Sequence, residues 1–265
     1  MPVRATCPPA DATIPVMPQR VLSLMAHPDD AEFLCAGALI RLQEKGWEVH
    51  IASMTPGDCG SMQLPPEQIA ALRLEEGRHA AARIRGHFHC LHCRDLLVFH
   101  DAETIRKAVE LIRKINPALV ITHYPRDYMS DHESTSMVAR MACFGAPAPN
   151  FRTGVLPAAA AVAHIPHLYY ASPIEGIDIF GDPVPCPIAI DISNVIGLKS
   201  DMLACHQSQR AWLQAQHGMD EYIDAMKRWS AEVGRRIGVQ YAEAYRQHKG
   251  HAYPQSDLLA DLLTS

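Results

Sequence analysis

The fold of this chain follows from the stretch Val21-Leu22-Ser23-Leu24-Met25-Ala26-His27-Pro28-Asp29-Asp30, which joins an apolar run to a histidine and two carboxylates. The apolar run, residues 21–26, predicts a buried strand, and the pattern that begins near Ala31 predicts a helix. His27, Asp29 and Asp30 therefore stand at a strand-to-helix turn, at the carboxyl end of the first strand. Open α/β sheets bind their ligands at this end of the strands.

Strand-like and helix-like segments alternate through the first half of the chain. The predicted strands are residues 21–26, 48–54, 87–92 and 118–123. The predicted helices are residues 31–45, 66–84, 101–116 and 131–143. The strands are continuously apolar, as expected when both faces of a sheet are covered. This order predicts an α/β fold with a Rossmann-like, mainly parallel sheet, flanked by helices and joined by right-handed crossovers.

The second half is less regular, but it contains no internal repeat and no low-complexity linker. Two further strands are predicted at residues 168–172 and 188–192, and two helices at residues 195–205 and 220–247. We therefore expect one domain over residues 20–265. Residues 1–19 are rich in proline and have no apolar core of a signal peptide, so we expect an irregular N-terminal arm.

Composition excludes several classes of protein. Hydrophobic residues make up 48% of the 265, charged residues make up 20%, and the net charge is −5. This balance argues against nucleic acid or an anionic membrane as the main partner, and no stretch is long and apolar enough for a membrane span. Eight scattered cysteines favour a reduced, cytoplasmic protein. Cys90 and Cys93 have the spacing of a zinc or redox pair, but without a second pair we expect them in a strand core.

The turn after the first strand has the side chains of a metal site. His27 and Asp30 are three residues apart and can point at one ion, and the pair Asp131-His132, which follows another strand-like run, could supply the third ligand. Asp29 lies between the first two and would remain beside the metal, free to accept a proton from water. Metal-assisted hydrolysis requires this arrangement. The alternative is a turn in which an aspartate only caps the helix.

Five elements, in this order, resemble a known family. Ala26-His27-Pro28-Asp29-Asp30, followed by Cys35-Ala36-Gly37, resembles the signature of the LmbE/PIG-L family of zinc-dependent N-deacetylases. The other four elements are Thr55-Pro56-Gly57-Asp58-Cys59-Gly60, Arg73-Leu74-Glu75-Glu76, Asp131-His132 and His206-Gln207-Ser208-Gln209.

The resemblance implies a role for each matching residue. His27, Asp30 and His132 would be the zinc ligands, one zinc per chain, and Asp29 the general base that later protonates the leaving amine. Asp131 would orient the site. Substrate contacts would come from Arg73, Asp58 and His123, although Asp58 could be a turn residue and Arg73 could form an intrahelical ion pair with Glu76.

One position departs from the family pattern. The family's His-Pro-Asp-His motif reads Met129-Ser130-Asp131-His132 here, and its first histidine stabilises the oxyanion. Methionine cannot donate that hydrogen bond, and the loss of one such donor costs about 3 kcal/mol in the transition state. His123, His206 and Arg73 are the candidates to replace it. We favour His206, because its neighbours belong to a matched motif.

Together these features predict a soluble zinc hydrolase that removes an acetyl group from the amide nitrogen of a small amino-sugar conjugate. Iron, cobalt or manganese could also fill a site of this kind. The resemblance also implies a homo-oligomer. Two alternatives stay open: an amidase or esterase on another small conjugate, and a non-catalytic sugar- or nucleotide-binding protein. The chain has no G-x-G-x-x-G, no G-x-x-x-x-G-K-[ST] and no G-x-S-x-G motif.

Overall fold

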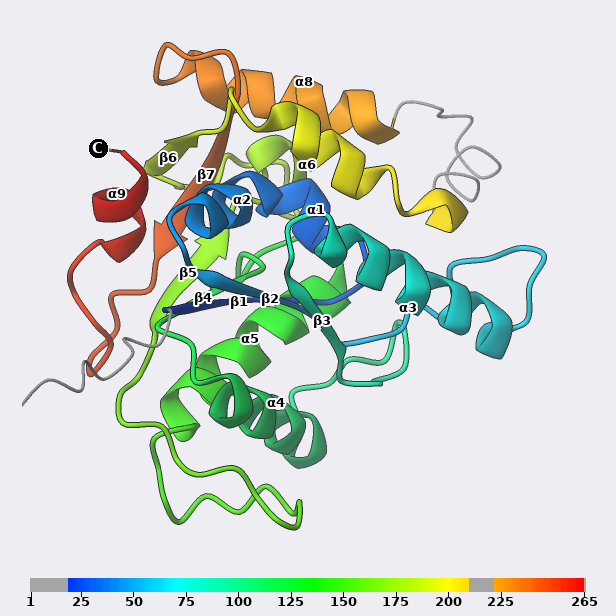
Figure 1. Cartoon of the computed structure of the whole chain (residues 1–265), viewed down its shortest axis with the longest axis vertical. Helices are drawn as coiled ribbons and strands as arrows, with labels where there is room; N and C mark the ends of the chain where they lie inside the picture. The colour runs from blue at the N-terminus through cyan, green and yellow to red at the C-terminus, as the bar shows by residue number, and fades with distance from the viewer. Residues whose placement is uncertain (1–18, 210–221, 265) are drawn as a thin grey trace, which may run out of the picture.

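One seven-stranded sheet forms the centre of the molecule. The computed structural model describes residues 19–209 and 222–264 (Figure 1). The strands are β1 Arg20–Met25, β2 Glu48–Ser53, β3 His87–Cys90, β4 Leu119–Thr122, β5 His167–Ala171, β6 Ile188–Asp191 and β7 Ala242–Gln247. Their order is β3-β2-β1-β4-β5-β7-β6. The first five strands are parallel, and β7 runs antiparallel between β5 and β6.

Helices cover both faces of this sheet (Figure 1). They are α1 Asp30–Leu34, α2 Ala36–Glu44, α3 Pro66–Ala82, α4 Ala102–Ile115, α5 Ser130–Gly145, α6 Ile196–Leu203, α8 Tyr222–Arg235 and α9 Leu258–Leu263, with a short 3₁₀ turn, η1, at Ile174–Gly176. The helices α4 and α5 lie on one face, and α1, α2 and α6 lie on the other. The predicted α/β architecture with a mainly parallel, helix-flanked sheet is confirmed.

Side chains of β1 alternate between two buried clusters. Val21 and Met25 pack with α1 and α2, whereas Leu22 and Leu24 pack with α4 and α5. All four side chains are fully buried, which explains why the strand has no polar face. The predicted first-half elements match the observed ones within a few residues, except that the helix predicted at 31–45 is divided at Cys35 into α1 and α2.

The helix predicted at residues 220–247 is wrong over its second half. The helix α8 ends at Arg235, and residues 242–247 form the strand β7. After α8 the chain folds back against Gly234. Glycine is needed at this position, because a Cβ there would stand 2.6 Å from the carbonyl oxygen of Val239. The sequence from Ala242 is rich in helix-forming residues, but pairing with β5 and β6 overrides that preference.

A buried carboxylate anchors β7 to the rest of the fold. Glu243 accepts hydrogen bonds from the backbone N–H groups of Gly37 and Ala38, at 2.7 and 2.8 Å. It also accepts from Lys199 Nζ at 2.6 Å and from the Tyr245 hydroxyl at 2.6 Å. These bonds fix β7, the last strand in the sequence, to the first turn of α2 and to α6.

Two of the sequence-based expectations concern residues that lie partly outside the described ranges. Residues 1–18 of the predicted N-terminal arm, and Trp212 and the start of the last predicted helix, lie outside the described residues. Within the described ranges, no helix combines the length and the hydrophobicity that a membrane crossing needs.

Candidate metal and catalytic centre

The candidate site lies where the strand order reverses. The chain runs outward from β1 through β2 to β3 and then crosses back to place β4 on the other side of β1. Loops that follow the carboxyl ends of β1, β3 and β4 meet there, as expected for a ligand site in an open α/β sheet. The three predicted metal ligands come from the first and third of these loops.

His27, Asp30 and His132 point at one another. His27 Nδ1 lies 3.3 Å from Asp30 Oδ2, and His132 Nε2 lies 3.5 Å from Asp30 Oδ1. One ligand atom from each residue lies within 4.8 Å of the other two. In a tetrahedral zinc site with bonds of about 2.0–2.1 Å, neighbouring ligand atoms stand about 3.3–3.4 Å apart. The residues present therefore fit a zinc ion.

Carboxylates hold the other nitrogen of each imidazole. His27 Nε2 lies 2.9 Å from Asp95 Oδ1 and 3.4 Å from Asp131 Oδ2. His132 Nδ1 lies 2.9 Å from Asp127 Oδ1. Metal-binding histidines are usually oriented in this way, since the outer partner fixes the ring and raises its basicity. Asp131 thus contacts His27, from the other half of the site.

The charge around the two histidines favours a cation. Burial lowers the pKa of His27, but its hydrogen bonds with Asp131 and Asp30 outweigh that effect and raise the pKa well above its usual value. Burial likewise lowers the pKa of His132, while Asp30 and Asp127 raise it to about 9. Both shifts report a strongly negative surrounding, which a divalent metal would neutralise.

Asp29 lies beside the ligands in a strained backbone conformation. Its φ of 109° is in the left-handed region, which costs about 1–3 kcal/mol for a residue other than glycine. Its side chain caps no helix N–H group, which argues against the capping alternative. Instead, Oδ2 accepts a 2.7 Å hydrogen bond from the Tyr222 hydroxyl and lies 3.4 Å from Arg73 Nη2. Burial raises the pKa of Asp29 despite the opposing charge of Arg73.

Arg73 is buried and supports two loops. Its Nη2 donates to the carbonyl oxygen of Pro28 at 2.8 Å, and its Nη1 to that of Gly57 at 3.5 Å. A Cβ on Gly57 or Gly60 would stand 2.4 or 2.6 Å from Nη1, so only glycine admits the guanidinium. The structure thus places Arg73 as a support for Asp29, and its role as a substrate contact stays a prediction.

Glu76 does not pair with Arg73. It accepts hydrogen bonds from the backbone N–H of Ser208 at 2.8 Å and from the Ser208 hydroxyl at 2.6 Å. Two motifs that are far apart in the sequence therefore meet, and their contact joins α3 to the segment after α6.

Two other predicted residues, Asp58 and His123, contact the surrounding loops and ligands. Asp58 accepts a 2.9 Å hydrogen bond from the backbone N–H of Asp95 and so ties two loops together. His123 is fully buried, accepts from the N–H of Ala26 at 3.0 Å, and stacks on the ligand His132 with ring centres 3.8 Å apart. These positions suit support of the site better than the substrate contacts expected for them.

His206, the expected oxyanion donor, is also buried. It is 1% exposed, and its Nε2 lies 3.4 Å from Glu32 Oε2. Burial lowers the pKa of His206, while the charge of Glu32 and of Asp29 raises it overall. Both ring nitrogens are buried without a hydrogen-bond partner, and the role expected for His206 stays a prediction.

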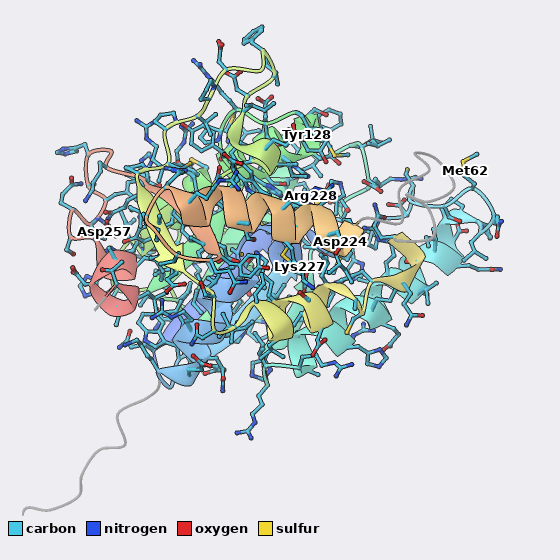
Figure 2. The ribbon with its side chains drawn as sticks, turned by 90° about the horizontal axis from the view of Figure 1, so that it is seen from above. Met62, Tyr128, Asp224, Lys227, Arg228 and Asp257 are labelled. Atoms are coloured by element: carbon cyan, nitrogen blue, oxygen red, sulfur yellow. The ribbon has the colours of Figure 1, made fainter. Side chains whose placement is uncertain are left out.

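Sequence reasoning missed Tyr128. This side chain is 62% exposed, and its ring meets the imidazole of His132 edge-on at 5.3 Å (labelled in Figure 2). Burial and the nearby charge of Asp30 raise the pKa of Tyr128, so its hydroxyl stays protonated. Its position next to Met129 in the sequence was the one available signal.

Comparisons with known proteins agree with this geometry. Residues 22–143 match the family model PIG-L, described as GlcNAc-PI de-N-acetylase. Diacetylchitobiose deacetylase of Thermococcus kodakarensis is 27% identical over 239 residues, which cover 86% of this chain and 82% of that protein.

Solved structures share the fold. N,N'-diacetylchitobiose deacetylase from Pyrococcus horikoshii superimposes with a TM-score of 0.74 at 23% identity, over 91% of this chain and 88% of that one. GalB, the 4-carboxy-2-hydroxymuconate hydratase of Pseudomonas putida KT2440, superimposes with a TM-score of 0.71 at 20% identity, over 90% and 99%. At these identities the likeness establishes the architecture. Residues 22–143 contain both halves of the His/Asp/His site, and this segment belongs to the PIG-L (LmbE-like) family.

Proposed function

We propose that this protein is a zinc-dependent hydrolase that removes an acetyl group from the amide nitrogen of a small amino-sugar conjugate. The observation that carries the proposal is the convergence of His27, Asp30 and His132, with Asp29 beside them, at the carboxyl edge of the sheet. The similarity to diacetylchitobiose deacetylase supports the choice of substrate class.

Each residue then has a chemical task. Zinc, when bound by His27, Asp30 and His132, would lower the pKa of water and polarise the amide carbonyl. Asp29 takes the proton from the attacking water and returns it to the leaving nitrogen, so a free amine and acetate are formed. Its raised pKa suits both halves of this exchange. The Tyr222 hydroxyl and Arg73 hold the Asp29 carboxylate in place.

Metal content and amine release together test the proposal. The purified protein should contain about one zinc per chain and release amine from N-acetylglucosamine or chitobiose-type conjugates. A chelator should remove both the zinc and the activity. Asp30→Ala should do the same, since the two remaining protein ligands do not hold the ion. Stoichiometric zinc with no amine release from any acetylated sugar would contradict the deacetylase assignment, and aryl ester hydrolysis in the same samples would favour the esterase alternative.

Tyr128 is our candidate for the oxyanion donor that Met129 cannot supply. Tyr128→Phe should lower kcat by about 10²- to 10³-fold, the usual effect of one lost donor, with little change in zinc content. Tyr253→Phe is the matched control, because its hydroxyl instead donates to the carbonyl oxygen of Arg140. Full turnover in Tyr128→Phe, together with loss of turnover in a folded, zinc-loaded His206→Gln, would return the role to His206.

The proposal includes a reducing compartment. The seven cysteines of the described residues are all free thiols, which is compatible with a reducing compartment.

Because GalB, a hydratase, has the same architecture, the fold alone does not distinguish hydrolysis from hydration. The amine-release assay makes that distinction.

A further inference from the structure

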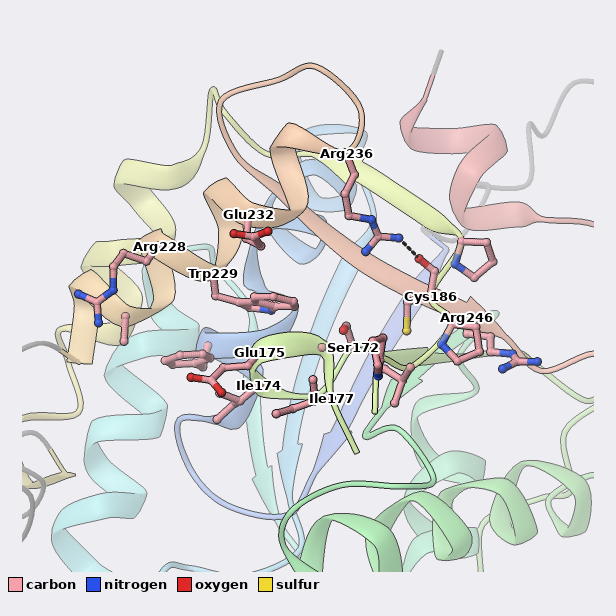
Figure 3. A pocket seen from close by; sticks show the side chains of 17 residues that line it. Ser172, Ile174, Glu175, Ile177, Cys186, Arg228, Trp229, Glu232, Arg236 and Arg246 are labelled. Atoms are coloured by element: carbon pink, nitrogen blue, oxygen red, sulfur yellow. Dashed lines mark hydrogen bonds between the residues drawn. The ribbon is translucent and has the colours of Figure 1, made fainter. Parts of the chain in front are cut away.

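A large pocket lies beneath α8, next to the candidate catalytic centre (Figure 3). Its volume is about 840 Å³, within the range of pockets that bind small molecules. One wall is α8, and the others are the segment after β5, residues 172–177, and residues 183–187. The pocket thus opens at the carboxyl edge of the parallel strands.

Two aromatic side chains connect this pocket to the general base. Phe33 lines the pocket and belongs to α1, the helix that begins at Asp30. Its ring packs against that of Tyr222, with centres 5.6 Å apart. The Tyr222 hydroxyl donates to Asp29. These two contacts link the lining of the pocket to the Asp29 carboxylate.

The apolar part of the pocket is built around Trp229. Its indole projects from α8 toward the turn at Ile174–Gly176 (Figure 3). Gly176 has a φ of 67°, and a Cβ there would stand 2.6 Å from Trp229 Cη2. Only glycine lets the turn approach this closely, so the ring is held in place. A fixed, partly exposed indole suits stacking against a flat or ring-shaped group.

The charged part of the pocket is mostly cationic. Three arginines line it, and Figure 3 shows Arg228 and Arg246 toward opposite ends. Arg236 donates to the carbonyl oxygen of Cys186 at 2.7 Å. Of the two lining glutamates, Glu232 is paired with Arg235, which is not part of the pocket.

Arg246 joins this pocket to a second one. The second pocket, of about 450 Å³, lies beside residues 124–126, directly after His123. Arg246 Nη1 donates to the Tyr124 hydroxyl at 3.1 Å, which fixes the guanidinium between the two hollows. A ligand that extends along the pocket from the indole and carries a carboxylate or phosphate would therefore find a positioned arginine in the same lining.

We propose that the pocket beneath α8 binds the substituent that the reacting amino sugar carries, and not the sugar itself. This inference rests on the proposed function and refines its substrate class. The occupant has a ring that stacks on Trp229 and an anionic group that pairs with Arg246. The preferred substrate is then an acetylated amino sugar with an anionic, ring-bearing substituent, and the free monosaccharide is a poorer one.

Three substrates and three variants test this specificity. The substrates are N-acetylglucosamine, its 4-nitrophenyl β-glycoside and its 4-carboxyphenyl β-glycoside. For the wild type, kcat/KM should rise in that order. Trp229→Ala should reduce the advantage of both aryl glycosides over the monosaccharide about tenfold, the usual loss at an aromatic contact. Arg246→Gln should remove only the advantage of the carboxyl group, also about tenfold. Lys227→Gln, on the same helix but outside the lining, is the control (Figure 2).

A binding measurement separates failure of this inference from failure of the proposed function. Titration calorimetry with the deacetylated 4-carboxyphenyl glycoside of glucosamine needs no turnover. Binding that weakens in Trp229→Ala and Arg246→Gln, but not in Lys227→Gln, supports the pocket even if no amine is released. Amine release at equal kcat/KM from all three substrates, with equal binding in all variants, would overturn the pocket and leave the deacetylase standing.

Discussion

Asp29→Asn should lower kcat/KM for amine release by about 10³- to 10⁴-fold, while the zinc content of the purified protein stays the same. The loss lies in the upper part of the range for proton transfer because one carboxylate serves twice, as base and then as acid. Asparagine tolerates the left-handed backbone that this position requires, so the turn itself should survive. Steady-state kinetics and metal analysis of the same preparation measure both quantities.

Asp58→Asn is the matched control for this experiment. It makes the same chemical change at the same edge of the sheet, and its remaining amide oxygen can still accept from the Asp95 N–H. Its turnover should stay within a few-fold of wild type. Wild-type turnover in Asp29→Asn would remove Asp29 from the mechanism, whereas loss of zinc in that variant would make Asp29 a ligand.

Glu243→Ala should lower the free energy of unfolding by about 3–5 kcal/mol. The substitution leaves the Lys199 ammonium, 1% exposed, without its carboxylate, and it also leaves two backbone N–H groups of α2 without an acceptor. Urea unfolding followed by circular dichroism measures the change.

The double variant Lys199→Met, Glu243→Gln is the informative comparison. It removes both charges, and the glutamine oxygen can still accept from the start of α2. It should regain a large part of the stability that Glu243→Ala loses. A loss below about 1 kcal/mol in Glu243→Ala would mean that the buried pair contributes no more than an exposed one.

The first half of the fold could be predicted because its strands and helices are encoded locally, by continuous apolar runs and helical periodicity. The strand β7 could not be predicted from local patterns. Its residues, from Ala242 to Gln247, favour a helix in isolation, and only the open edges of β5 and β6 determine their pairing.

The candidate metal ligands could be predicted for a similar reason, since His27 and Asp30 are neighbours in one turn. Asp95 belongs to no motif, and only the parallel pairing of β1, β2 and β3 brings it to His27. Burial was the other missing information. Both Arg73 and His206 belong to matched motifs, yet whether such a side chain faces a substrate or supports a loop depends on packing that no local pattern contains.

One helix, α8, touches both the general base and the pocket. Tyr222 and Trp229 are seven residues apart, about 10 Å along a rigid axis. A group that stacks on Trp229 therefore contacts the same helix whose Tyr222 holds the Asp29 carboxylate. Interaction energy gained far from the scissile bond can in this way align the reacting atoms, so that a truncated substrate loses kcat and not only affinity. Substrate specificity and kcat would then both depend on how tightly α8 packs against the site.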